Sequence, residues 1–139
     1  MAGTQNTKTV NLVVGEDLNG DFAQALTIDS DGRVIKASAA TSVIVGFLAE
    51  DPGRTTVDGV DSVPVTLIGG GGVGKAVAVG AITAGNIIIP TTTAGLVDGA
   101  ANIAALIANQ MGVGYALEAA TAANDVIEVL MMPVSGPNA

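Results

Sequence analysis

An internal repeat constrains the fold of this chain more than any other feature of its 139 residues. Four short segments of the first half match four segments of the second half in the same order, at offsets between 63 residues (Asp31 to Ala94) and 68 residues (Val45 to Val113). The matched pairs are Gly15–Phe22 with Gly80–Ile87, Asp31–Val34 with Ala94–Val97, Val45–Leu48 with Val113–Ala116, and Ser62–Leu67 with Asp125–Leu130. A unit with an apolar face can bury that face against a second such unit, so the repeat predicts a body organised around packing.

The matched segments lie in runs that predict short β-strands. Val, Ile and Thr dominate these runs, because branched side chains fit a pleated surface. The predicted strands are Val10–Val14, Phe22–Ile28, Arg33–Ser38, Ser42–Leu48, Val63–Ile68, Lys75–Val79, Asn86–Ile89, Met111–Leu117 and Asp125–Met132. Dipeptides typical of turns separate them, at Asn19-Gly20, Asp31-Gly32, Asp58-Gly59 and Asp98-Gly99. Many short strands with regular turns predict an all-β fold whose compact body resembles a barrel or a sandwich.

The sequence predicts one β domain over residues 10–139, preceded by a flexible N-terminal arm at residues 1–9. The arm is small and polar and cannot bury a core of its own. Within the domain we expect two pseudo-repeats, at about 15–69 and 80–132, joined by a glycine-rich connector at 69–74.

One segment departs from the β pattern and breaks the repeat. Ala100–Asn109 is rich in alanine, and its Ile103, Leu106 and Ile107 are spaced three and four residues apart, as on one face of a helix. The segment therefore predicts a short helix. The matching stretch of the first half, near Ser38–Ser42, is shorter.

The composition disfavours most catalytic and ligand-binding classes of protein. Cysteine and histidine are absent, which removes thiolate nucleophiles, the commonest general base and the commonest zinc ligand. The net charge of −8 opposes binding to nucleic acid. Three aromatic residues, Phe22, Phe47 and Tyr115, are too few for a stacking platform. We therefore expect no enzyme activity, no catalytic, cofactor-binding or metal-binding residue, no cofactor and no nucleic-acid partner.

A membrane span is also disfavoured, although Ala76–Val97 is uncharged and long enough to cross a bilayer. This segment contains glycine, threonine, asparagine and proline, whereas a lipid-spanning helix is dominated by large apolar residues. Met1–Val10 is polar and does not resemble a signal peptide. We therefore expect no membrane partner. The many apolar residues and few charges predict a subunit that buries surface against other chains.

Gly69–Ala76 resembles a phosphate-binding loop but lacks its chemistry. The last position, Ala76, has no hydroxyl group for magnesium, and a strand pattern follows in place of a helix. A connector between the two half-units is the better interpretation. Lys75 nevertheless permits an alternative function, because lipoyl and biotinyl carrier domains are small all-β modules with an internal repeat and a lysine at a hairpin tip. In that alternative the chain is a binding or carrier module with Lys75 as the attachment point.

Two other patterns have a structural interpretation. Acidic residues cluster at Glu16-Asp17 with Asp21, Asp29 with Asp31, Glu50-Asp51, and Asp58 with Asp61. No cluster supplies the ladder of oxygen ligands that calcium requires, so we interpret the clusters as solvated turns. Gly46-Phe47 and Gly114-Tyr115 occupy equivalent repeat positions. We interpret each as a core aromatic residue beside a glycine where two strands approach closely.

The sequence resembles the phage capsid cement, or decoration, proteins over most of residues 10–132. The resemblance is carried mainly by the second half, in Gly74–Asn86, Gly112–Ala120 and Asn124–Leu130, and in the first half by Gly32-Arg33-Val34 and Val45–Leu48. It implies an all-β structural protein on the exterior of a virion capsid, made in the host cytoplasm. Its implied partners are the major capsid protein, whose subunits it bridges and stabilises, and further copies of itself in a homotrimer.

Overall fold

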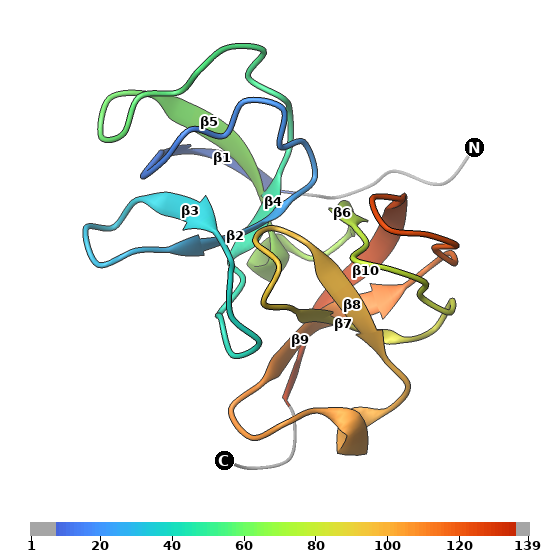
Figure 1. Cartoon of the computed structure of the whole chain (residues 1–139). Coiled ribbons are helices and arrows are strands. Elements are labelled where there is room, and N and C mark those ends of the chain that lie inside the picture. The colour runs from blue at the N-terminus through green and yellow to red at the C-terminus, as the bar shows by residue number, and fades with distance from the viewer. Residues whose placement is uncertain (1–7, 136–139) are drawn as a thin grey trace.

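The computed structural model describes residues 8–135 and contains two lobes, each built on a five-stranded antiparallel sheet (Figure 1). The strands of the first lobe are β1 (Lys8–Val13), β2 (Ala25–Ile28), β3 (Val34–Lys36), β4 (Gly46–Leu48) and β5 (Ser62–Leu67). Those of the second lobe are β6 (Val73–Val77), β7 (Ile87–Pro90), β8 (Val97–Ala100), β9 (Met111–Ala116) and β10 (Val126–Ser135). Two 3-10 helices, η1 (Ile68–Gly70) and η2 (Ile103–Ala105), have three residues each. The predicted all-β fold class is confirmed, and the body is sandwich-like, not a closed barrel.

The two sheets have the same order of strands. The first sheet runs β1-β5-β4-β2-β3 and the second runs β6-β10-β9-β7-β8, which are identical orders when each lobe is counted from its own first strand. The register matches as well, because Gly46 lies opposite Leu67 in β5 and Gly114 lies opposite Met131 in β10. These pairings correct two of the four sequence matches: the counterpart of Ser62 is Val126 and not Asp125, and the counterpart of Ile87 is Ala25 and not Phe22. The two sheets are thus the two pseudo-repeats. The predicted repeats begin at residues 15 and 80, but each structural repeat includes one strand before these limits, β1 in the first lobe and β6 in the second. The sequence match did not include these two strands because their residues have little in common.

One hydrophobic cluster, which we call the seam core, joins the two lobes. From the first lobe it takes Ala25, Ala37, Ile44, Phe47 and Ile68. From the second lobe it takes Ala76, Ala78, Ile82, Ile88, Val97, Val113, Ala116, Ala120, Ile127, Val129 and Met131. The first lobe has a further core of its own, formed by Val14, Leu18, Leu26, Val34, Leu48, Val63 and Val65. The lobes therefore share one interior, in which burial of apolar surface favours their association.

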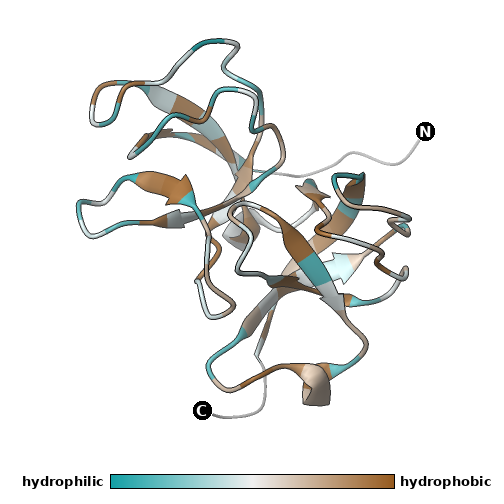
Figure 2. Ribbon diagram, viewed as in Figure 1, coloured by the Kyte–Doolittle hydropathy of each residue, from teal (hydrophilic) through white to brown (hydrophobic). Residues whose placement is uncertain are grey.

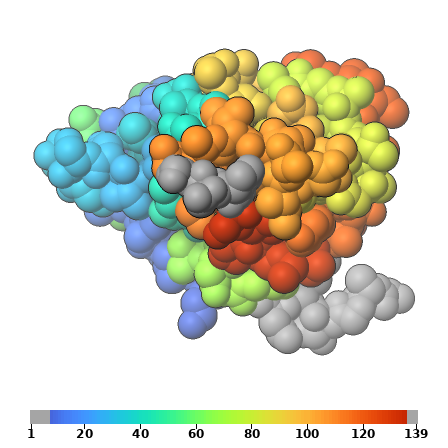
Figure 3. All heavy atoms as spheres, turned by 90° about the horizontal axis from the view of Figure 1, so that it is seen from below, coloured from blue at the N-terminus to red at the C-terminus, as the bar shows by residue number. Residues whose placement is uncertain are grey.

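Hydrogen bonds also tie the lobes together. The backbone N–H of Ala25 donates to the carbonyl of Gly95 at 2.8 Å, and the N–H of Gly95 donates to the carbonyl of Ala37 at 2.8 Å. The buried side chain of Gln110 donates from Nε2 to the carbonyl of Ala40 at 3.0 Å. Figure 3 shows this region from below, where the orange segment that follows β8 lies near the teal loop around residue 40.

Three of the four predicted turn dipeptides lie in turns, and the fourth prediction is wrong. Asn19-Gly20, Asp31-Gly32 and Asp58-Gly59 connect strands, but Asp98 and Gly99 lie within β8. A Cβ atom at Gly99 would come 2.7 Å from Oδ1 of Asn86. Gly99 leaves room for the side chain of Asn86. Its φ is not positive, so it does not have the backbone conformation of a turn glycine. A dipeptide pattern cannot distinguish these two uses of glycine.

The predicted helix within 100–109 is reduced to η2, capped by Asn102, whose side chain accepts from the N–H of Ala105 at 3.1 Å. The offset between the repeats rises across this segment, from 63 residues (Ala37 to Ala100) to 68 (Gly46 to Gly114). Apart from η2, residues 101–110 form bends and turns that connect β8 to β9, which starts at Met111, so the expected longer helix is not formed.

The predicted arm and connector both need correction at their ends. Residues 1–7 lie outside the described residues, but Lys8 and Thr9 belong to β1 and pair with Leu67 and Thr66. The connector at 69–74 contains the end of η1 and the first two residues of β6. Figure 2 shows hydrophobic segments in the strands of both lobes, while hydrophilic segments lie in many of the loops and within β8. No helix of the described residues is long and apolar enough to cross a membrane.

Candidate functional site

The structure places Lys75 inside a strand. Lys75 is the third residue of β6 and pairs with Glu128 of β10, so it does not lie at a hairpin tip. The glycine-rich segment before it leads into this strand and not into a helix, so it cannot present helical N–H groups to a phosphate. The geometry expected of a carrier lysine is therefore missing at Lys75.

The acidic clusters stabilise the loops in which they lie. The carboxylate of Asp51 accepts from the N–H groups of Gly53 and Gly20, and these bonds lower its pKa. Asp61 accepts from Nη2 of Arg54 at 3.1 Å and from the N–H of Val57 at 2.7 Å, and both bonds lower its pKa. The interpretation of these acids as turn residues is consistent with this geometry.

The acid at the matching position of the second lobe has the same role. Asp125 accepts from the N–H of Thr121 at 2.8 Å, from the hydroxyl of Thr121 at 3.1 Å and from the N–H of Ala122 at 3.1 Å. These bonds lower its pKa. Asp61 and Asp125 each precede the strand that carries the lobe's central pairings, β5 and β10. Among residues 8–135, no three acidic side chains are grouped so that they could hold a metal ion.

Thr56 is a buried polar residue that the sequence analysis did not single out. Its hydroxyl accepts from the N–H of Leu18 at 2.8 Å and donates to the carbonyl of Glu16 at 3.0 Å, while its own N–H donates to Asp17 at 3.1 Å. The bonds to Asn19 and Thr56 lower the pKa of Asp17. Because its partners are far away in the sequence, no local pattern could have identified Thr56.

The glycine–aromatic pairs lie where strands approach closely, as predicted. A Cβ atom at Gly46 would collide with the carbonyl oxygen of Thr66, and one at Gly114 would collide with the carbonyl oxygen of Leu130. Phe47 is buried in the seam core. Tyr115, its counterpart in the second lobe, is only partly buried, so the prediction of a core aromatic residue is wrong at this position.

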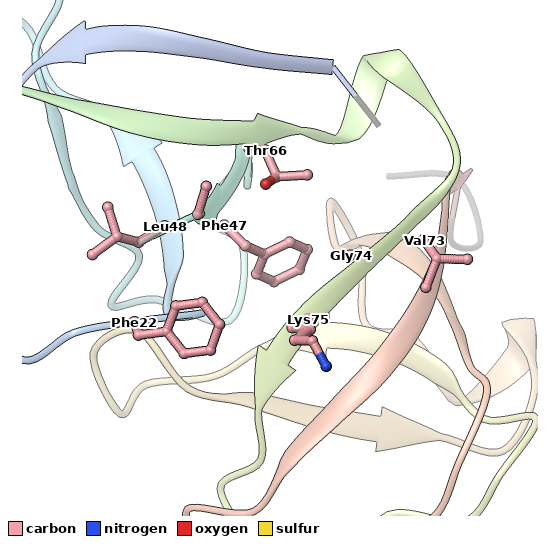
Figure 4. A pocket seen from close by; sticks show the side chains of 8 residues that line it. Phe22, Phe47, Leu48, Thr66, Val73, Gly74 and Lys75 are labelled. Atoms are coloured by element: carbon pink, nitrogen blue, oxygen red, sulfur yellow. The ribbon is translucent and has the colours of Figure 1, made fainter. Parts of the chain in front are cut away.

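Two grooves open along the seam between the lobes. The first has a cavity volume of about 180 Å³ and is lined by Phe22, Phe47, Leu48, Ala49, Thr66, Val73, Gly74 and Lys75. Figure 4 shows the rings of Phe22 and Phe47 on one side of this groove and Lys75 of β6 on the other. The second, of about 360 Å³, is lined by Val43, Ile44, Val45, Leu67, Ile68, Gly69, Met111, Gly112, Val113 and Pro133. The second lining contains no titratable side chain, so this groove suits apolar contact.

The second lobe has an outer apolar face that the sequence analysis missed. Tyr115, Leu130 and Met132 lie on this face. At one end it is covered by a small cluster, which we call the outer cluster, of Ile87, Ala100, Leu106 and Val134. The available signal was the continuous apolar run Val129–Met132 in β10, which makes both faces of the strand apolar.

Comparison with known proteins supports a fold shared with a phage head component. No protein-family model matches the chain, and no curated protein matches it. The fold is similar to that of the N base of head fiber gp8.5 in bacteriophage phi29, known from a crystal structure. The TM-score is 0.58 at 15% sequence identity, and the match covers 91% of this chain and 94% of that chain. The two proteins thus share nearly the whole architecture at a low level of sequence identity.

Proposed function

We propose that this chain is a structural protein of a phage virion, which decorates the outer surface of an icosahedral head and stabilises it by bridging major capsid subunits. The observation that carries the proposal is the fold it shares with the phi29 head fiber base over 91% of its length. The proposed partners are the major capsid protein and further copies of the chain in a homotrimer. The proposed location is the capsid exterior, after synthesis in the host cytoplasm.

The construction of the two lobes supports a structural role. Buried apolar packing and loop-capping carboxylates account for most of the side chains singled out from the sequence. A chain that binds many equivalent positions on one particle needs only modest affinity at each contact, because linked contacts raise the effective concentration. In this proposal the protein is not an enzyme.

Co-sedimentation with empty expanded heads tests the proposal. Purified chain is mixed with heads over a range of concentrations, and bound protein is measured after pelleting. We expect binding to saturate at a fixed ratio to the major capsid protein, and decorated heads to withstand heating better than bare heads. Unexpanded heads of the same phage serve as the control surface. Binding that does not saturate, or equal binding to an unrelated particle, would contradict the proposal.

A further inference from the structure

We propose that the outer face of β6, β10 and β9 in the second lobe is the surface through which one copy of this chain binds a second copy. The inference rests on the self-association included in the proposed function, and it assigns the surface responsible. It is supported by a comparison between the two repeats, because four residues of this face have counterparts in the first lobe that the strand pairing identifies.

Four residues of this face are larger and more apolar than their counterparts. Strand register and matching backbone hydrogen bonds pair Val126 with Ser62, Leu117 with Ala49, Leu130 with Thr66, and Val73 with Thr9. At these four neighbouring positions the second lobe always has the larger and more apolar residue, although the two lobes have the same fold. Because both units keep the same backbone pairing, the fold itself does not require the apolar residues.

Solvent exposure of the face makes this difference unexpected for an isolated chain. The exposed fractions are 44% for Val126, 49% for Leu117, 39% for Leu130 and 46% for Met132. In the first lobe, Ala49 and Thr66 line the seam groove and face β6. Two of the smaller residues therefore lie beside the other lobe, whereas their larger counterparts Leu117 and Leu130 face solvent. An exposed group of large apolar side chains of this kind marks a protein interface.

The face continues an interface that already exists within the chain. Val73 lines the seam groove, and from it one cross-strand row runs through Leu130 and Tyr115 to Ile87. The equivalent row of the first lobe contains Phe47 and Ala25, both buried in the seam core against the second lobe. This fold therefore already uses the same face to bind one lobe to another.

The charges on the face suit a second copy. Lys75 and Glu128 lie opposite each other on it, and Glu118 lies at its edge, where its carboxylate accepts from the N–H of Glu128. The three ion pairs of the described residues involve Arg33, Lys36 and Arg54, so within residues 8–135 Lys75 forms none. Lys75 of one copy can therefore meet a carboxylate of the next.

The distribution of acids supports the same choice of partner. Residues 1–69 hold nine acidic and four basic residues, a net charge of −5, whereas residues 70–139 hold four acidic residues and one basic residue, a net charge of −3, so the larger share of the repelling charge lies in the other lobe. Association through the second lobe keeps those acids apart, which lowers the electrostatic cost of bringing two chains of net charge −8 together.

Sedimentation of the full chain measures the association. The test variant is Leu117→Ala combined with Leu130→Thr, which gives this face the residue types of the first lobe at two positions and so preserves the fold. The control is Val60→Thr, which removes an apolar residue that is 73% exposed in a first-lobe turn. We expect wild type and control to assemble alike, and the double variant to dissociate about tenfold more readily or more. Unchanged circular dichroism and melting temperature establish that it is folded.

Two results overturn the inference. One is a wild-type chain that sediments as a 13.5 kDa monomer at all concentrations, and the other is a double variant that assembles as wild type does. Head binding, measured separately, distinguishes failure here from failure of the proposed function. Assembly through this face without head binding supports the inference and contradicts the function. Loss of head binding in a double variant that still assembles as wild type assigns the face to the capsid shell and overturns the inference.

Discussion

Substitution of Gly46 by alanine tests the close strand approach on which both lobes depend. Gly46 lies in the middle of the first sheet, on a strand hydrogen-bonded to both β2 and β5. A Cβ atom at this position would collide with the carbonyl oxygen of Thr66 and lie 2.7 Å from Cγ1 of Val65. The carbonyl is part of the β5 backbone, so it cannot rotate away as a side chain could. The substitution must therefore separate β4 from β5 or shift both strands.

The expected cost follows from two opposing effects. Inserting a methyl group into a packed interior costs about 1–3 kcal/mol. Replacing glycine by alanine also reduces the entropy of the unfolded chain, which offsets about 0.4–1 kcal/mol of that cost. The difference lies between about 0 and 2.6 kcal/mol, and because the colliding atom belongs to the backbone, we expect its upper part, about 1.5–2.5 kcal/mol of lost stability. For a chain of this size that corresponds to a fall in melting temperature of roughly 4–12 °C.

Thermal and denaturant unfolding monitored by circular dichroism measure this difference. Gly80→Ala is the matched control, because a Cβ atom at Gly80 would have no neighbour within 4 Å and its φ is not positive. The control is expected to melt at or slightly above the wild-type temperature, since only the unfolded-state effect remains. A Gly46→Ala variant that melts with the control would refute the reasoning. It would show that the strands can separate at no cost.

Three further predictions concern single contacts. Thr56→Val leaves the N–H of Leu18 without its acceptor in the protein interior, so we expect a loss of about 1–3 kcal/mol in urea unfolding; unchanged stability would mean that water replaces the hydroxyl. Leu106→Ala removes the side chain that covers the outer cluster and is expected to cost about 2–5 kcal/mol, whereas a loss below 1 kcal/mol would show that the 101–110 segment is not anchored there. Because the folded state lowers the pKa of Asp125, its contribution to stability is present above the unfolded pKa, near 4, and is lost as pH falls through the lower folded pKa. Melting temperatures between pH 6 and pH 3 should therefore fall less for Asp125→Asn than for wild type, and parallel curves would contradict this role.

The parts of the fold that follow from local chemistry could be predicted from the sequence. Branched residues marked nine of the ten strands, and glycine after aspartate or asparagine marked three turns correctly. The close approach at Gly46 and Gly114 and the burial of Phe47 were predicted correctly from equivalent positions in the repeat, but Tyr115 is not a core residue. The strand β8 was missed, since Gly99 serves a contact with Asn86 that is distant in the sequence.

The outer face of β6, β10 and β9 could not be recognised from the sequence of a single strand. Leu130 and Met132 alternate with buried Val129 and Met131, so β10 is apolar on both faces, and sequence alone cannot say which face is covered. Only the placement of the lobes shows that the first lobe buries its Phe47 face whereas the second leaves the equivalent face largely open.

The sequence by itself determined that this chain is all-β, is built from two related units and lacks the side chains of common catalytic sites. These properties follow from residue type and short-range spacing, which act within one strand or turn. Tertiary structure alone decided that the two units pack asymmetrically, with the first lobe set against the core of the second. Two identical strand orders can pack together in more than one way, and the choice depends on contacts between residues far apart in the sequence. Phe47 in the seam core and its partly exposed counterpart Tyr115 differ for that reason.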